Sequence, residues 1–414
     1  MTATRPTLVP FALAAFFVVV QFYTSLAALS PTPPVGYVFA TPAVAAGLVA
    51  VLVLAALVCL ASLWRDRAWP GGASRRLLAA WILSAALSGL FGFDPISSAQ
   101  VVGIMLVTGI FHVALVRYFD EPGTAAAVVG AYLAAGVVAT VAALLMVVTR
   151  LPASLWSLNH GRAAGFFVTA NQLAAYLIAF IFVALGAALA WRGALRWVAS
   201  GAAVLALAAL ALTVSVAGWL GAAVAATYLA FALGAKRLGA ALVACAVIAA
   251  LAIALRSPAG HNPADVFDRL RIWRSGIRVA ELFPLWGVGP MAYWRVYPQI
   301  RPPNADAPGT FGALHPHDAY LSLAGETGAV GLTAFGYGSW CFVRAMRAAL
   351  RVASPSRRRL ALGTCAALIA VLVQGVFDTI GIVEMAFVWI PYTALALAAA
   401  GTGAGAGNAY GVRR

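Results

Sequence analysis

Charged side chains are scarce in this chain. Asp, Glu, Lys and Arg make up 9% of its 414 residues, against about 25% in a typical soluble globular protein. Hydrophobic residues make up 63% of the chain, and apolar runs of about 20 residues recur along its whole length. This composition excludes a disordered chain, a fibrous repeat protein and a water-soluble enzyme. It predicts an all-α integral membrane protein with many spans.

Cysteine is also rare. The chain has four cysteines, and each falls inside an apolar run that we expect to cross the membrane. A disulfide bond or a cysteine-based metal site is therefore not predicted.

Twelve stretches are long and apolar enough to be transmembrane helices, and most of them end at charged residues, proline or glycine. The stretches are 8–29, 42–64, 77–93, 100–118, 124–148, 171–191, 196–214, 216–234, 238–256, 319–345, 359–378 and 385–401. The first is taken as a span and not as a secretory signal, because its apolar run is too long. The boundary between 196–214 and 216–234 is the least defined, since almost no polar residue separates them.

Twelve spans put both chain termini on the same side of the membrane. If that side is the cytoplasm, 18 of the 27 basic residues are cytoplasmic, together with only three acids, Asp66, Asp120 and Glu121. The basic and acidic residues of the outer side then cancel. The whole net charge of +15 lies on one side, as the positive-inside rule requires, and nucleic-acid binding is not needed to explain it.

The longest polar stretch covers residues 257–318, between the ninth and tenth spans. We expect it to be an ordered outer loop inserted into a single membrane domain of residues 1–414. One apolar stripe at helical spacing predicts an amphipathic helix in this loop, made of Val266, Leu270, Trp273 and Ile277. A basic row along one edge of the stripe would suit lipid head groups; its members are Arg271, Arg274 and Arg278. Arg269 lies on the opposite edge.

The loop ends with two of the five histidines, His315 and His317, directly before an apolar helix that also carries Glu326. The pair is a poor metal site, because residues two apart do not share a helical face and no third ligand is near. The outer acids show no Asp-x-Asp pairing either, so neither a metal nor another cofactor is predicted. One neutral imidazole is enough for a general base. Taken alone, either histidine could instead be a hydrogen-bonded residue at the membrane interface.

Three segments on the outer side together form a pattern. His317 and Asp318 are followed by nine residues and then by a Gly-x-x-Gly pair, Gly328 and Gly331. Upstream, an Arg-x-x-x-Trp segment precedes a glycine turn; it consists of Arg269 and Trp273, then Pro284, Gly287 and Gly289. Earlier still is an Arg-x-x-Gly and Asn-x-x-Ala segment, formed by Arg162, Gly165, Asn171 and Ala174. Over about residues 160–340 this set resembles the O-antigen ligase and polymerase superfamily of bacterial envelope glycosyltransferases, and especially its ligases.

The resemblance implies a fold like that of the GT-C membrane glycosyltransferases, with the active site on the periplasmic side of the inner membrane. It implies an inverting transfer of a glycan from undecaprenyl diphosphate to an acceptor hydroxyl. In that reaction His317 would be the general base, and three arginines would bind the donor diphosphate: Arg269, Arg162 and Arg274. Possible further substrate contacts are His315, Asn171, Asp318 and Glu326.

Two positions depart from the pattern of the superfamily. Asp318 stands where the ligases usually have Asn, Ser or Gln. Val216 ends the segment Thr213-Val-Ser-Val216, where many members have an arginine thought to act on the donor phosphates. Either another arginine substitutes for it (Arg162, Arg150 or Arg274), or this chain handles its donor differently.

Several activities share these motifs. A ligase would transfer the glycan to lipid A–core oligosaccharide, a polymerase to another lipid-linked repeat unit, and a protein O-oligosaccharyltransferase to Ser or Thr. A chain of this length with no extra C-terminal domain favours the ligase. The alternative that is not an enzyme is a transporter of lipid-linked glycans. Transporters commonly have two related halves and polar residues near the bilayer midplane, whereas this sequence shows no internal repeat and its polar residues gather at one face. The expected partners are the lipid-linked donor, the lipid A–core acceptor and membrane lipids, with no nucleic acid.

Overall fold

The computed structural model describes residues 8–20, 42–68, 71–255, 263–300, 315–377 and 382–401. All regular secondary structure within these ranges is α-helical, apart from single residues in tighter turns. Each of the twelve stretches predicted to cross the membrane overlaps an α-helix.

The helices that match these stretches are α1 (Val9–Val19), α2 (Pro42–Arg65), α3 (Gly72–Phe91), α4 (Pro95–Tyr118), α5 (Thr124–Thr149), α7 (Ala170–Ala190), α8 (Ala194–Thr213), α9 (Val216–Ala232), α10 (Lys236–Leu255), α13 (Ala319–Val352), α14 (Pro355–Gln374) and α15 (Ile382–Ala400). Three further helices lie in the predicted outer loops: α6 (Ala153–Leu158), α11 (Pro263–Leu282) and α12 (Tyr293–Ile300). The helix predicted from the periodicity of residues 264–283 corresponds to α11.

Within the described residues, five helices are long and apolar enough to cross a membrane. They include α4, α5, α7 and α8 over their full lengths, and α2 from Ala46 to Arg65. Shorter apolar helices occur at Val9–Val19, Val216–Ala232 and Ala386–Ala400. Many large apolar side chains on these helices are exposed, as expected of a protein that faces lipid. The chain is an all-helical, multi-pass membrane protein.

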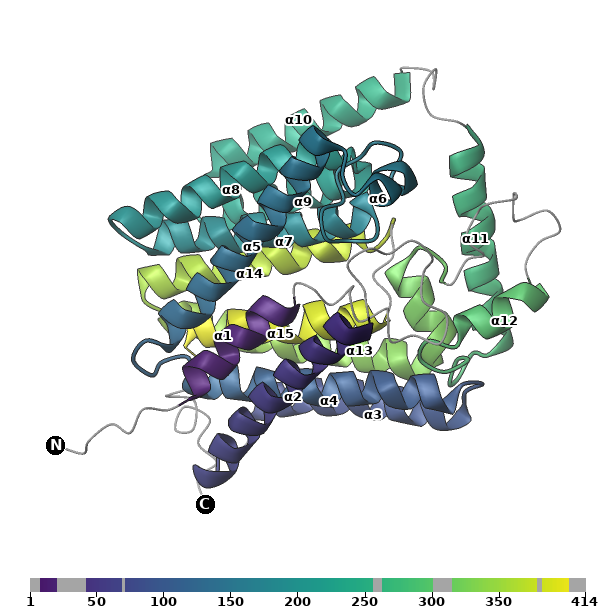
Figure 1. Cartoon of the computed structure of the whole chain (residues 1–414), viewed down its shortest axis with the longest axis horizontal. Coiled ribbons are helices and arrows are strands. Elements are labelled where there is room, and N and C mark those ends of the chain that lie inside the picture. Colours follow the sequence, from purple (N-terminus) through teal and green to yellow (C-terminus); the bar gives the residue numbers. More distant parts are fainter. Residues whose placement is uncertain are drawn as a thin grey trace.

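The helices lie roughly side by side, and α6, α11 and α12 gather at one end of the bundle, on the right in Figure 1. Helix α14 packs against α7, α9 and α15, and α13 packs against α3, α11 and α15. The contact between α7 and α14 is close because it is made by glycines. A Cβ atom at Gly363 would lie 2.5 Å from the Cα atom of Gly186, and small residues of this kind let membrane helices approach each other.

The poorly defined boundary between the stretches 196–214 and 216–234 is a sharp turn in the structure. Val214 ends α8 in the left-handed region, with φ 51°, and the Ser215 hydroxyl accepts a hydrogen bond from the Gly218 amide at the start of α9. A serine cap of this kind starts a new helix. Two helices therefore form where hydropathy alone shows an almost continuous apolar run.

Candidate functional site

Two of the predicted site segments, those of Asn171 and His317, lie where helices begin and end at one end of the bundle. Gln374, the last residue of α14, donates a hydrogen bond from Nε2 to the carbonyl oxygen of Asn171 at the start of α7 (2.9 Å). The next residue, Gly375, accepts a hydrogen bond from the Ala319 amide at the start of α13 (2.7 Å). The segments that carry Asn171 and His317 are thus held on either side of the end of α14.

Arg162 lies in the loop before α7 and is half-buried. Its Nε donates to the carbonyl oxygen of Thr213 and its Nη2 to Oδ1 of Asn171, both at 2.7 Å. The Asn159 side chain cross-links the same loop, because it donates a hydrogen bond to the Val168 carbonyl and accepts one from the Ala170 amide. Arg162 therefore sits in a rigid frame of hydrogen bonds.

The bond between Arg162 and Thr213 bears on the arginine that the sequence lacks at position 216. Thr213 is the last residue of α8, and Val216, which is 63% exposed, is the first residue of α9. The guanidinium of Arg162 is thus bound to the segment in which the superfamily has its own arginine. Of the three arginines considered as substitutes, Arg162 is the one that the structure joins to this turn.

His315 and His317 are in contact just before α13. Their ring centroids are 4.4 Å apart with the planes at 72°, and the His317 amide donates to Nδ1 of His315 (3.4 Å). His317 has a left-handed backbone, with φ 51°, which is unusual for histidine. Burial, and then electrostatic repulsion from the neighbouring His317 ring, hold the pKa of His315 well below its ordinary value of 6.5. His315 is therefore neutral at physiological pH.

Asp318 is buried and caps the first turn of α13. Its Oδ1 accepts hydrogen bonds from the amides of Tyr320 and Leu321, both at 2.8 Å. Burial raises the pKa of this carboxyl above 3.8, although the two amides oppose the shift. The residue that departs from the ligase pattern thus has a structural task as a helix N-cap.

Helix α11 packs beside this turn. A Cβ atom at Gly276 would lie 2.9 Å from the Cβ atom of Pro316, so the helix and the residue before His317 are in close contact. The Trp273 ring lies 6.4 Å from the ring of Phe377, which follows α14. Arg274 is exposed, on the face of α11 opposite Gly276. The side chain of Arg269 lies outside the described residues. Its position on α11 is on the same face as Gly276, since the two are seven residues, or about two turns, apart.

The two glycine motifs of the sequence pack against each other. Gly328 interrupts α13 with φ 62° and ψ −161°, and a Cβ atom there would lie 2.4 Å from the carbonyl oxygen of Leu285. Gly287 has φ 69°, and a Cβ atom there would lie 2.3 Å from the carbonyl carbon of Glu326. The amides of Val288 and Ala329 complete the joint with hydrogen bonds to Gly325 and Pro284. These motifs therefore let the two backbone segments come into direct contact.

Glu326 belongs to the same joint. Its side chain is 5% exposed, and Oε2 accepts a hydrogen bond from the amide of Met291 (3.1 Å). Met291 itself has a left-handed backbone, with φ 59°. The carboxylate thus holds the turn between α11 and α12 against α13.

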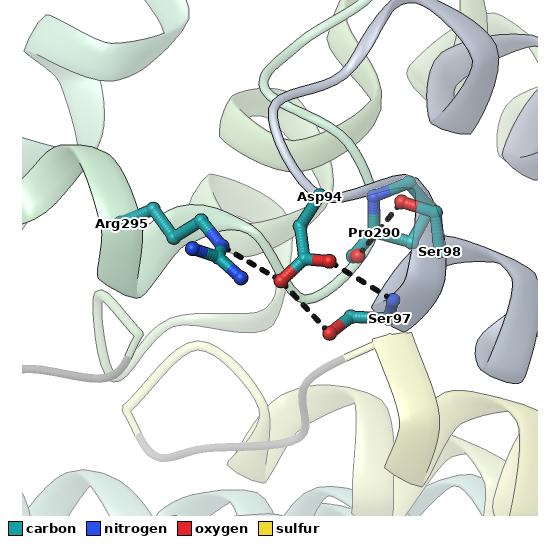
Figure 2. A network of polar contacts seen from close by, with 5 residues as sticks. All are labelled: Asp94, Ser97, Ser98, Pro290 and Arg295. Atoms are coloured by element: carbon teal, nitrogen blue, oxygen red, sulfur yellow. Dashed lines mark hydrogen bonds and ion pairs between the residues drawn. The ribbon is translucent and has the colours of Figure 1, made fainter. Parts of the chain in front are cut away.

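Sequence reasoning missed an ion pair between distant segments, which Figure 2 shows. The Asp94 side chain, 5% exposed, caps α4 through the amide and hydroxyl of Ser97 and binds Nε of Arg295 at 2.7 Å. Burial alone would raise the pKa of Asp94, but the hydrogen bonds from Ser97 and Arg295 outweigh it and lower the pKa below 3.8. The acid at the start of an apolar helix was visible in the sequence; its partner 201 residues away was not.

No three His, Cys, Asp or Glu side chains come together as a metal site in the described ranges. What the geometry does provide is a cation held at one helix turn and a pair of contacting imidazoles at another, both joined through hydrogen bonds to the end of α14. This arrangement is that of a membrane protein with a polar site at one surface.

Residues 201–336 match the family model described as O-antigen ligase. The match confirms the resemblance to the O-antigen ligase and polymerase superfamily. It supports an O-antigen ligase or polymerase type of function, which is that of a membrane glycosyltransferase. It includes the Thr213–Val216 turn, α11, the glycine joint and His317, whereas Arg162 and Asn171 precede it. None of the curated proteins matches the chain.

Proposed function

We propose that this protein is an O-antigen ligase that transfers a glycan from undecaprenyl diphosphate to lipid A–core oligosaccharide. The observation that carries the proposal is that the end of α14 binds both Asn171, the partner of Arg162, and the residue Ala319 just after the His317 turn, in a chain whose residues 201–336 match the ligase family model. The arginine suits an anionic leaving group, and the histidine suits an acceptor hydroxyl.

The arginines fit the donor. A diphosphate leaves without protonation, so the reaction needs stabilisation of negative charge more than it needs a general acid. Arginine provides this because its planar guanidinium binds phosphate through two N–H groups and stays charged. Arg162, Arg269 and Arg274 are the proposed diphosphate ligands, and Asn171 orients Arg162. Arg274, which is exposed on α11, would reach a phosphate from the side of the solvent.

The histidines fit the acceptor. His317 is the proposed general base, and a base of this kind typically contributes about 10²–10⁴ in rate. His315 contacts it without competing for a proton, because the pKa of His315 is held well below 6.5. The direct attack of an activated acceptor on the sugar would invert the anomeric configuration and would need no metal ion.

The opposite end of the bundle supports a periplasmic location for the site. There Arg357 donates to the carbonyl oxygens of Ala398 and Ala399, and Arg359 donates to that of Leu189. These bonds occupy the C-terminal ends of α15 and α7, where cations are favourable. An end rich in arginine is typical of the cytoplasmic side. On this orientation the chain lies in the inner membrane with both termini in the cytoplasm.

The test is transfer by purified protein in nanodiscs, with an undecaprenyl-diphosphate glycan and EDTA present. Lipid A–core is added to one sample and left out of the other. We expect glycan on lipid A–core in the first sample and none with His317→Ala. Longer lipid-linked glycans without lipid A–core would identify a polymerase instead, and transfer to an added Ser/Thr-containing peptide a protein glycosyltransferase. In sealed proteoliposomes, movement of the lipid-linked glycan across the bilayer without any transfer would contradict an enzyme.

A further inference from the structure

Gln374 stands between the two halves of the proposed site, although no motif marks it in the sequence. It is the last residue of α14, and its side chain is 1% exposed. Its Nε2 donates to the carbonyl oxygen of Asn171. A carbonyl oxygen can only accept, so this bond fixes which end of the amide is nitrogen and which is oxygen.

The other end of this amide has no partner. Oε1 of Gln374 is buried, and no donor binds it among the described residues. The Asn159 amide at this end binds on both sides, and the Thr213 hydroxyl donates to the Leu210 carbonyl, whereas Nε1 of Trp273 and of Trp389 are also buried without a partner among the described residues. A buried acceptor without a donor is unfavourable, and the unpaired atoms of both tryptophans are donors only, so Oε1 of Gln374 is the acceptor here that calls for an incoming hydrogen-bond donor.

A small opening lies beside the same end of α14. Leu372 and Gly375, close to Gln374 in the chain, line this open, apolar pocket together with Ala319 and Trp389. Ala319 is the first residue of α13, two positions after His317. The pocket therefore lies between the last turn of α14 and the first residue of α13.

The place of Gln374 also matches a requirement of the proposed reaction, on which this inference rests. The anomeric carbon of the donor must lie between the leaving diphosphate and the acceptor oxygen held by the base. Gln374 is one hydrogen bond away from Asn171, the partner of Arg162. It is also joined through Gly375 to Ala319, beside His317. A side chain between the phosphate ligand and the base is where the first sugar has to be recognised.

We infer that Gln374 binds the first sugar of the lipid-linked donor, with Oε1 accepting a hydrogen bond from a sugar hydroxyl or acetamido N–H. This residue then selects the sugar next to the diphosphate, while Arg162 binds the diphosphate whatever sugar it carries. Gln374 is accordingly a residue for specificity and positioning, and takes no part in proton transfer.

The test compares two ligands on the whole protein in nanodiscs. One is bare undecaprenyl diphosphate, and the other is a panel of undecaprenyl diphospho-hexoses with and without an N-acetyl group. Binding is measured for the wild type, for Gln374→Met, and for Thr364→Val as a matched control on the same helix. Thr364 is buried, but its hydroxyl is satisfied by the Leu360 carbonyl. Thermal unfolding of each variant checks that it is folded.

We expect the wild type to bind its preferred sugar-bearing lipid about tenfold more tightly than the bare lipid, the effect of about one good hydrogen bond. Gln374→Met should remove this preference and leave the affinity for bare undecaprenyl diphosphate unchanged, and Thr364→Val should change neither. A preference that survives in Gln374→Met, or an equal loss for both ligands, would overturn the inference while leaving the proposed transferase intact. A wild type that binds neither ligand would overturn the proposed function as well.

A second measurement needs no variant. Donors that lack one hydroxyl or the acetamido N–H of the first sugar are compared on the wild type, and one of them should lose about tenfold in affinity. If all of them bind as well as the parent donor, no hydrogen bond is made to Oε1 and the inference is wrong. This series decides the matter even if Gln374→Met fails to fold.

Discussion

The Nε atom of Arg162 donates a 2.7 Å hydrogen bond to the carbonyl oxygen of Thr213, 51 residues further along the chain. Through this bond the cation is held at the turn between α8 and α9, three residues before Val216. A guanidinium from a loop thus lies at the segment where related chains have an arginine of their own. This contact supports Arg162 as the substitute for the cation that the sequence lacks at position 216.

The first prediction follows from this replacement. Arg162→Ala should reduce donor affinity by about 10- to 100-fold, since a charge-assisted bond to phosphate is lost and the Thr213 carbonyl loses a donor. Val216 is exposed, so an arginine fits there, and Val216→Arg in the Arg162→Ala background should recover part of the loss. Donor binding in nanodiscs measures both. Failure of the double variant to recover any donor affinity would show that an arginine at position 216 does not replace Arg162 in binding the donor.

The second prediction separates the two histidines. His317→Asn should lower the rate of transfer by about 10²–10⁴, with little effect on folding, because asparagine tolerates the left-handed backbone that His317 adopts. His315→Asn should cost less, since His315 contacts the base without being it. Single-turnover rates and thermal unfolding of both variants give the comparison. A larger rate loss at position 315 than at 317 would reverse the assignment.

The third prediction concerns the glycine joint. Gly328→Ala should destabilise the protein by at least about 2 kcal/mol, because the new Cβ meets the Leu285 carbonyl and the residue has a positive φ. Gly336→Ala is the matched control, since nothing lies within 4 Å of a Cβ atom at that position of the same helix. Unfolding in detergent should distinguish the two variants. Equal stability would mean that the joint adapts without strain.

The fourth prediction is a pH effect at the ion pair. The pKa of Asp94 is lowered in the folded state, so its contribution to stability is present above pH 3.8 and is lost as the pH falls through the lowered value. Arg295→Met removes one cause of the lowering, so acid unfolding should begin at a higher pH than in the wild type. The expected loss at neutral pH is about 1 kcal/mol, small because Arg295 is half-exposed.

A control for this experiment lies in the pair of Arg278 and Glu281, whose side chains are both more than half-exposed. Arg278→Met should leave the onset of acid unfolding unchanged, because an exposed pair contributes little. The same shift in both variants would mean that general surface charge, and not the partner of Asp94, sets the onset.

The sequence by itself determined the features that depend on residues close together along the chain. Runs of apolar residues indicated where helices form, and the 3.6-residue period indicated α11. The charges indicated an orientation, and the motif spacing selected His317 and Arg162 and led to the superfamily that the family model supports. Each of these rests on residue type and local spacing, which survive without knowledge of the fold.

Only the tertiary structure decided which distant groups meet. Arg162 pairs with Thr213, Asp94 with Arg295 and Gln374 with Asn171, across separations of 51, 201 and 203 residues. The structure also shows that Asp318 caps α13, that Glu326 binds the Met291 amide and that the glycines make close backbone contacts, none of which motif spacing predicts. The reason is physical: hydropathy and helical period act over a few turns, whereas these hydrogen bonds exist only once the ends of separate helices have packed together.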